Sequence, residues 1–206
     1  MKTILILLAV ILVAITLVQL YFLRSQRDIE TYPYEVIKKY DRFEIRSYEA
    51  TLFTSVKLST KGYENSSSKG FSVLAGYIFG NNDRNEKISM TSPVVMSLQD
   101  SMTMMFMVPK KYNKDMLPKP NRSDIEIKEE PAKLLAAIGF SGWASDTKIE
   151  KYKQNLKAAL DAEGIKYSSR FYFFGYNAPY EVLNRKNEVL VELESESGAQ
   201  TTQKRS

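Results

Sequence analysis

The 206-residue sequence contains no cysteine and no histidine. Without cysteine the chain forms no disulfide and offers no thiolate as nucleophile or metal ligand, and its redox compartment stays undetermined. Without histidine it lacks the usual general base near neutral pH and the commonest metal ligand, which excludes catalytic triads and zinc–water sites. No pair of carboxylates is placed by its spacing for acid–base catalysis. We therefore predict that the protein is not an enzyme and holds no metal site of its own.

Charge of one sign is also scarce. The 29 lysines and arginines are balanced by 24 acidic residues, and the net charge of +5 is spread along the sequence. Nucleic-acid binding needs a concentrated basic face, so we expect no nucleic-acid partner. Aromatic residues are plentiful by contrast: 13 tyrosines and 10 phenylalanines supply enough area for the core of one domain or for an apolar cleft.

One long hydrophobic run extends from Thr3 to Leu23, with basic residues on both sides. About 20 residues of helix span a hydrocarbon core of about 30 Å. A cleaved signal peptide has the same outline, but no small-x-small cleavage motif follows the run. We predict a single-pass membrane anchor over residues 1–24 and a polar linker over 25–32. The flanking charges leave open which side of the membrane the remaining chain faces.

The rest of the sequence repeats one order of elements at an offset of about 80 residues: strands, a loop, a helix, then two strands. The first helix follows a serine-rich loop over 59–68 and ends at Gly80, and the second covers 147–163 and ends at Gly164. Two such halves pair their sheets around a pseudo-two-fold axis, with the helices covering the sheet and a cleft between helix and sheet as the ligand site. The predicted divisions are a domain over 33–194, halves of about 33–110 and 122–194, and a disordered tail over 195–206.

The first helix carries an apolar stripe. Phe71, Leu74, Ala75 and Ile78 are spaced i, i+3, i+4 and i+7, which places them on one face. This stripe is either a core face packed on the sheet or the wall of a cleft, and the spacing alone leaves both open. The methionine-rich strands that follow suit a plain core as well as an adaptable apolar pocket. For Trp143, the only tryptophan, we expect core packing.

Several motifs, taken in order, resemble those of the SOUL haem-binding protein family, and together they cover about residues 33 to 193. The strongest pair is similar to the family's YI-x-G-x-N and KI-x-MT-x-PV signatures. Others resemble its usual start, its strand end at a proline, its Y-D-P-P loop and its R-R-N-E-[VI] run. In chain order the matching segments are Tyr34-Glu35-Val36-Ile37, Phe43-Glu44-Ile45-Arg46, Gly76-Tyr77-Ile78-Phe79-Gly80-Asn81-Asn82, Lys87-Ile88-Ser89-Met90-Thr91-Ser92-Pro93-Val94, Val108-Pro109, Phe174-Gly175-Tyr176-Asn177-Ala178-Pro179 and Asn184-Arg185-Lys186-Asn187-Glu188-Val189.

The resemblance implies an α+β fold: a distorted β-barrel of two pseudo-symmetric halves with two helices, as in bacterial effector-binding domains. It also implies non-catalytic binding of haem or another tetrapyrrole, for transport, buffering or sensing, in an apolar cleft between the first helix and the loop near Tyr176. The cofactor-binding residues it implies are Lys69, Phe71, Leu74, Ala75, Ile78, Tyr176, Ala178 and Tyr180.

The sequence departs from the family pattern on the first helix. Some members have basic residues there that meet the haem propionates, whereas Ser68 and Gly76 stand at the matching positions and only Lys69 lies nearby. With no histidine for the iron, haem is expected to bind non-covalently, by apolar burial at about 25 cal/mol per Å², with tyrosine or methionine as the remaining candidates for the iron. The alternative is an interaction module that binds an effector, a lipid or a peptide in the same cleft.

Overall fold

The computed structural model describes residues 2–25, 29–59, 62–99, 101–178, 181 and 184–194. The chain divides into two compact units, Met1–Glu30 and Thr31–Ser206. Two of the sequence predictions, the disordered tail over 195–206 and the site residue Tyr180, lie outside the described residues.

The first unit contains helix α1, Lys2–Ser25. Large apolar side chains of this helix, such as Ile4, Leu8 and Leu12, are exposed. Within the part of the chain that the structure describes, no helix is both long and apolar enough to cross a membrane, so the membrane-spanning anchor predicted over residues 1–24 is not found.

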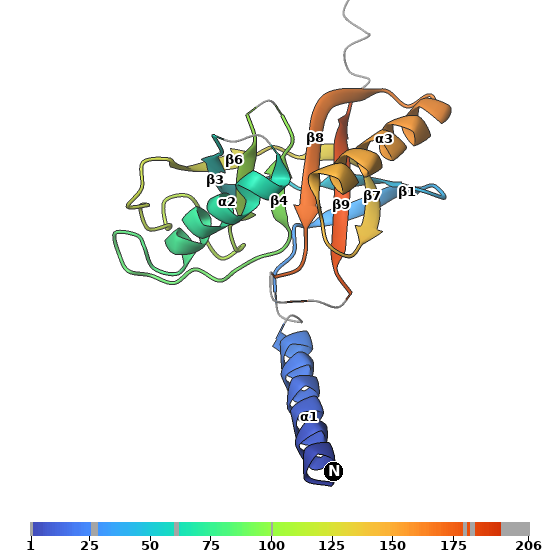
Figure 1. Ribbon diagram of the computed structural model, residues 1–206. Helices are drawn as coiled ribbons and strands as arrows, with labels where there is room; N and C mark the ends of the chain where they lie inside the picture. The colour runs from blue at the N-terminus through green and yellow to red at the C-terminus, as the bar shows by residue number, and fades with distance from the viewer. Residues whose placement is uncertain are drawn as a thin grey trace, which may run out of the picture. The chain divides into compact units, whose positions relative to one another are not determined.

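The second unit is α+β (Figure 1). All of its described strands join one antiparallel sheet, and two helices cover one face of that sheet. In chain order the elements are β1 Tyr34–Lys39, β2 Glu44–Tyr48, β3 Thr51–Lys57, α2 Tyr63–Ile78, β4 Val94–Ser97, β5 Thr103–Met107, β6 Ile125–Glu130, β7 Lys133–Ser141, α3 Asp146–Ala162, β8 Tyr167–Gly175 and β9 Lys186–Leu193.

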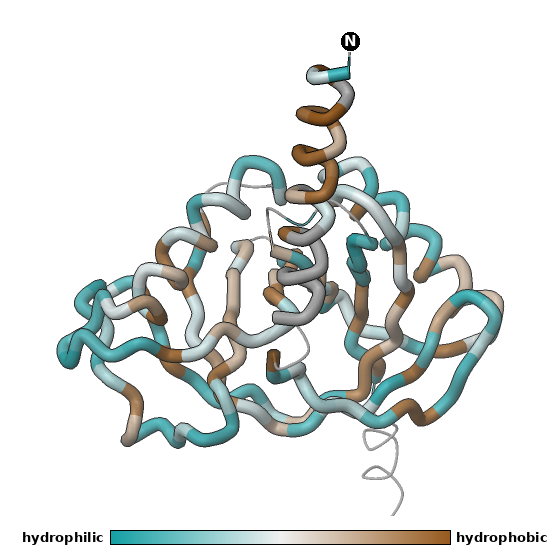
Figure 2. The backbone as a smooth tube through the Cα atoms, turned by 90° about the horizontal axis from the view of Figure 1, so that it is seen from below, coloured by the Kyte–Doolittle hydropathy of each residue, from teal (hydrophilic) through white to brown (hydrophobic). Residues whose placement is uncertain are grey.

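The strand order is β1-β2-β7-β9-β8-β4-β5-β3-β6. Apart from β1, which extends the sheet beyond β2, it is symmetric about the β8–β4 pair: β9, β7 and β2 follow on one side, and β5, β3 and β6 on the other. One strand of each half pairs with the other half, β2 with β7 and β6 with β3. The halves therefore exchange strands, and Figure 2 shows them side by side. The sheet is curled, and β1 and β6 end it without pairing to each other, so the distorted barrel of two halves expected from the sequence is an open half-barrel.

Strand side chains alternate between two cores, one on each face of the sheet. In β5, Met104 and Phe106 enter the core beneath α2 and α3, whereas Met105 and Met107 enter the core on the opposite face. The methionine-rich strand β5 therefore contributes to both cores. We call the second cluster the far-side core; its buried members are Tyr32, Tyr48, Phe53, Val95, Met105, Met107, Leu135, Ala137, Tyr172, Phe174 and Leu190.

Helix α2 begins earlier than predicted. Its first residue is Tyr63, inside the segment 59–68 that the serine-rich composition marked as a loop. Two observations explain the difference. Asp146 from α3 accepts the backbone N–H groups that the start of α2 leaves without an intrahelical partner, and Ser66 is buried despite its polar side chain. At the other end, Gly80 adopts the predicted left-handed conformation with φ +113°.

Strand β4 begins only after Pro93. Only Val94–Ser97 pairs as a strand, because Pro93 has no N–H to donate to a neighbour. The residues before it are held by side chains instead: the hydroxyl of Thr91 donates to the carbonyl of Met107 at 2.7 Å.

Candidate ligand-binding cleft

A cleft of about 290 Å³ lies between α2 and the helix-covered face of the sheet. Tyr63 and Phe71 of α2 form one wall, and Met96, Met104 and Phe173 form the floor. This volume is at the lower end of the range of about 300–1,000 Å³ that is usual for ligand pockets. The lining is mainly apolar, so the cleft suits the edge of a flat apolar ligand.

The wall formed by α2 is not the apolar stripe that the sequence indicated. Phe71 lines the cleft, together with Ser67, Ser68 and Ser72, which are its neighbours on that side of the helix. The other three members of the stripe turn toward the sheet and are buried in the core: Leu74, Ala75 and Ile78. Of the two alternatives that the spacing left open, the core applies to these three residues and the cleft wall to Phe71, because a helix packed on a sheet buries its most apolar face there and leaves the adjacent face to the cleft.

Two of the remaining predicted site residues also lie away from the cleft. Lys69 is exposed and borders a separate open hollow on α2, together with Gly76 and Arg122. Tyr176 packs against the far-side core, and its hydroxyl donates to Glu188 at 2.6 Å.

The loop after β8 reaches the cleft through a different residue. Asn177 lines the cleft, and the carbonyl of Ala178, the next residue, accepts a hydrogen bond from the guanidinium of Arg185 at 3.1 Å. The predicted loop therefore borders the cleft, but by its backbone and by Asn177, while the aromatic ring of Tyr176 points to the other face.

The mouth of the cleft contains a pair that the sequence interpretation missed. Trp143 is 57% exposed, contrary to the expected core packing, and the guanidinium of Arg185 lies 4.0 Å from the centre of its ring. Gly142, at φ +80°, turns the chain here and places Trp143 beyond the end of β7. Arg185 Nη1 donates to the carbonyls of Ala178 and Glu181, but its buried Nε has no hydrogen-bond partner within the described structure. An unmatched cationic donor therefore borders an apolar cleft.

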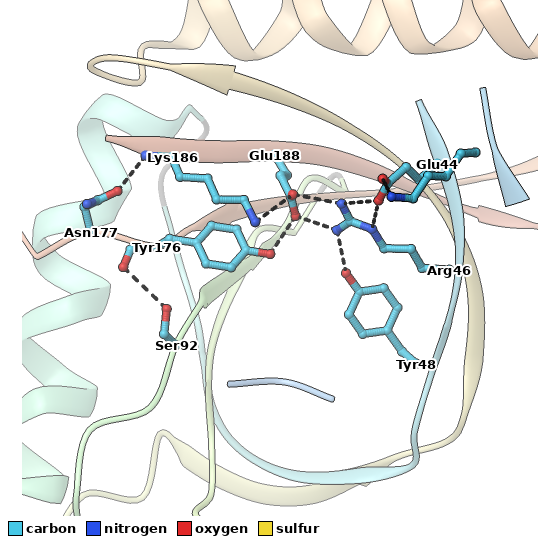
Figure 3. Close-up of polar contacts among 9 residues, drawn as sticks. Glu44, Arg46, Tyr48, Ser92, Tyr176, Asn177, Lys186 and Glu188 are labelled. Atoms are coloured by element: carbon cyan, nitrogen blue, oxygen red, sulfur yellow. Dashed lines mark hydrogen bonds and ion pairs between the residues drawn. The ribbon is translucent and has the colours of Figure 1, made fainter. Parts of the chain in front are cut away.

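A buried ionic cluster lies behind the cleft, on the opposite face of the sheet (Figure 3). Arg46 of β2 binds Glu188 of β9 through two hydrogen bonds, of 2.9 and 3.1 Å. Tyr176 donates to the same carboxylate, and Lys186 Nζ lies 3.2 Å from it. Arg46 also donates to Tyr48 at 3.3 Å. Charges taken out of water need this degree of pairing, and the cluster supplies it.

The pKa values in the cluster follow from these contacts. Burial raises the pKa of Glu188, but hydrogen bonds from Arg46 and Tyr176 outweigh burial and hold that pKa below its usual value. Burial raises the pKa of Tyr176, and the neighbouring Glu188 carboxylate raises it further. At neutral pH the carboxyl is ionised and the phenol is neutral, so Tyr176 serves as a hydrogen-bond donor to Glu188.

Asn187 and Glu188, consecutive in β9, act on opposite faces of the sheet. Asn187 lines the cleft and donates to the carbonyl of Gly142 at 2.8 Å, which holds the turn before Trp143. Glu188 anchors the ionic cluster behind it. The run that resembles the family's R-R-N-E motif therefore contributes Arg185 and Asn187 to the cleft lining and Glu188 to the ionic cluster on the opposite face of the sheet.

The described residues contain no group of three or more carboxylates, histidines or cysteines that would hold a metal ion. The side chains of the cleft that suit a haem iron are the thioethers of Met96 and Met104 and the phenol of Tyr63. Burial raises the pKa of Tyr63, so its phenol is neutral at ordinary pH.

A curled antiparallel sheet with two helices on one face and an apolar cleft beside α2 defines the class of this α+β domain. The family model described as SOUL heme-binding protein matches residues 29–192, and the chain belongs to that family. Among its relatives, Heme-binding protein 1 of Xenopus laevis is 30% identical over 156 residues, covering 71% of this chain and 81% of that protein. Heme-binding protein 2 of Homo sapiens is 28% identical over 156 residues, covering 71% of this chain and 76% of that protein.

Solved structures share the fold at low sequence identity. The C-terminal domain of EcmrR superposes with a TM-score of 0.58 at 10% identity, covering 79% of this chain and 98% of that one. A protein described as a hydrolase from Listeria innocua superposes with a TM-score of 0.51 at 9% identity, covering 77% of this chain and 94% of that one. At such identities the likeness extends to the fold alone.

Proposed function

We propose that the domain binds haem or a related tetrapyrrole non-covalently in the cleft beside α2, without catalysing a reaction, for transport, buffering or sensing. The observation that carries the proposal is the combination of an apolar cleft with a cationic side chain at its mouth, the guanidinium of Arg185 beside Trp143. Membership of the SOUL family, whose relatives above are named heme-binding proteins, supports the same ligand class.

The residues present fit a partly inserted macrocycle. A cleft of about 290 Å³ takes one edge of the ring between Phe71 and Phe173, and the rest of the ring extends past Trp143. The guanidinium of Arg185 is placed at the mouth to pair with a carboxylate on the ligand. When bound, haem supplies a redox-active iron and its absorption band. The chain supplies the apolar walls, the cationic donor and neutral side chains such as Met104, so we expect metal-free porphyrin to bind with similar affinity.

Titration of the purified protein with hemin and with protoporphyrin IX tests the proposal. Trp143 is the only tryptophan and lies at the mouth of the cleft, so its fluorescence is quenched on binding while the absorption band of the ligand shifts. Saturable changes with both ligands at micromolar concentration are expected. The absence of a saturable change with either ligand overturns the proposal.

The second candidate function is an interaction module that binds an effector, a lipid or a peptide in the same cleft. The serines on the α2 wall favour it, because Ser67, Ser68 and Ser72 offer hydroxyl groups that a porphyrin face does not use. A fatty acid or a peptide that competes with protoporphyrin IX and binds at least tenfold more tightly supports this candidate over the first.

We propose further that α1 attaches the protein to a membrane. The proposal is supported by the exposed apolar side chains of α1 and by the absence of acidic residues between Thr3 and Leu23. Fractionation of cells should place the full chain in the membrane pellet and a chain that begins at Ile29 in the supernatant. Recovery of the full chain in the supernatant contradicts it.

A further inference from the structure

The far-side core is closed by one aromatic ring that does not belong to the sheet. Ten of its eleven buried side chains lie on strands; Tyr32 comes from the segment that precedes β1. The helices α2 and α3 contribute nothing to this core among the described residues, because they cover the other face of the sheet. A single side chain from an irregular segment therefore completes the core.

The ring of Tyr32 is enclosed by three aromatic rings of the sheet. Its ring centre lies 4.7 Å from that of Tyr48, 5.2 Å from that of Phe53 and 6.3 Å from that of Phe174, with tilted or edge-on geometry. Only 5% of the residue is exposed. The space left around it is about 10 Å³, roughly the volume that one water molecule needs. One aromatic ring fills the chamber.

The segment that carries Tyr32 is held by few backbone contacts. The Tyr32 N–H donates to the carbonyl of Ser92 at 2.9 Å, and Thr31 forms an isolated bridge with Ser92. The next contact along the chain joins the N–H of Glu49 to the carbonyl of Pro33 at 3.3 Å. The ring contacts hold Tyr32 more extensively than its backbone does.

The rim of the chamber is polar. Lys133 and Glu130 form an ion pair beside it, and Lys133 Nζ also donates to the hydroxyl of Tyr172 at 3.3 Å. Glu130 also pairs with Lys128, which does not line the chamber. Among the lining residues the charges of Glu130 and Lys133 cancel, which favours a neutral ligand. Burial raises the pKa of Tyr32, in keeping with a neutral phenol there.

We propose that this chamber is a second binding site, for a single neutral aromatic ring of the phenol type, and that Tyr32 is its built-in occupant, which a free ligand displaces. The site is distinct from the cleft beside α2. Val95 and Phe174 line the chamber, whereas their chain neighbours Met96 and Phe173 line the cleft, so the thickness of the sheet separates the two. The inference does not depend on tetrapyrrole binding.

The first test removes the occupant. In the full chain, Tyr32→Ala should lower the Tm by about 10 °C, and phenol should restore most of the loss with a saturable dose dependence. The matched control is Tyr34→Ala, two residues away and 37% exposed, which leaves no enclosed cavity. Phenol should not raise the Tm of that variant. Equal responses of the two variants, or no response of Tyr32→Ala, overturn the proposal.

The second test uses the unaltered chain and does not depend on the stability of a variant. Displacement of Tyr32 breaks its hydrogen bond to Ser92, so the Tyr32 amide should exchange with solvent at least tenfold faster at millimolar phenol, measured by NMR. Amides in the β8–β9 ladder, such as that of Val191, should keep their exchange rates. An unchanged Tyr32 exchange rate at phenol concentrations that saturate Tyr32→Ala refutes displacement, and faster exchange throughout the sheet refutes a specific site.

Discussion

Glu64 and Asp146 cap each other's helices across the two halves of the domain. The N–H of Glu64, in α2, donates to Asp146 Oδ2 at 3.2 Å, and the N–H of Asp146, in α3, donates to Glu64 Oε2 at 3.4 Å. The N–H of Tyr63 donates to Asp146 Oδ1 at 2.5 Å. The two helix N-termini therefore meet, and each receives a carboxylate where the helix dipole favours one. Because Tyr63 lines the cleft, this contact also fixes one wall of the candidate site.

Asp146→Ala removes the acceptor of two backbone N–H groups at the start of α2. We expect the free energy of unfolding to fall by about 1 kcal/mol, the usual value of an N-terminal cap. Glu150→Ala, one turn further along α3, removes an exposed carboxylate that pairs only within its own helix and should cost less than about 0.5 kcal/mol. Urea denaturation of both variants measures the difference, and equal losses contradict the capping role.

Replacing the glycine before α2 and a glycine within α2 by alanine should change the stability of the fold in opposite directions. Gly62 has φ +93°, and an added Cβ lies 3.1 Å from Asp146 Oδ2, so Gly62→Ala should destabilise the fold by about 1–2 kcal/mol. Gly76 lies inside the helix with nothing within 4 Å of an added Cβ, so Gly76→Ala should stabilise the fold by about 0.5–1 kcal/mol. Thermal unfolding of both proteins checks this, and two shifts of the same sign would disprove the explanation.

Glu188→Gln removes the more buried of the two carboxylates that pair with Arg46, while Glu44 remains 2.9 Å from the guanidinium. Hydrogen bonds to charged groups contribute about 1.5–3 kcal/mol, and we expect a loss of that size in urea unfolding. The exposed carboxylate of Glu49, 3.9 Å from Lys110, serves as the control, and Glu49→Gln should cost less than about 0.5 kcal/mol. A loss below about 1 kcal/mol for Glu188→Gln would show that the cluster does not hold the fold together.

The same cluster predicts a pH dependence. The pKa of Glu188 is lower in the folded chain than its unfolded value of about 4.3, so its contribution to the free energy of unfolding is complete above that pH and is lost as the pH falls through the folded value. Unfolding measured between pH 6 and pH 3 should show a smaller decline in Glu188→Gln than in the unaltered protein. Some decline remains, because the pKa of Glu130 is also lowered: burial raises it, but hydrogen bonds from Lys128 and Lys133 outweigh burial. Identical declines contradict the assignment.

The sequence predicts where the helices and strands lie better than it predicts which strands pair. Alternating side chains and a 3.6-residue stripe identify the strands and helices, and Gly80 and Gly164 mark both helix ends, each at positive φ. The exchange of β2 and β6 between the halves depends on pairing over long sequence separations, which no local pattern contains.

The candidate site shows the same limit. The stripe of α2 indicates that one face is buried, yet both a core and a cleft bury apolar side chains, and only the packed structure separates Phe71 from Leu74. Arg185 and Trp143 are 42 positions apart in sequence and meet only because β7 and β9 pair. The family-like run over 184–189 was the sequence feature that could have indicated Arg185 as a site residue. For Trp143 the only such feature was the preceding glycine, which is a weak indication of a turn.

The most direct test of the account fills the cleft without disturbing the core. Leu74 is unsuitable because it is fully buried, whereas Ser68 is exposed on α2 and lines the cleft. Ser68→Tyr places a ring in the cleft, and Asn65→Tyr places the same ring one turn earlier, outside it; both keep Trp143 as the only tryptophan. We predict that Ser68→Tyr weakens binding of protoporphyrin IX at least tenfold in a Trp143-quenching titration, while Asn65→Tyr leaves it within twofold. Equal affinities for the two variants would contradict binding in this cleft.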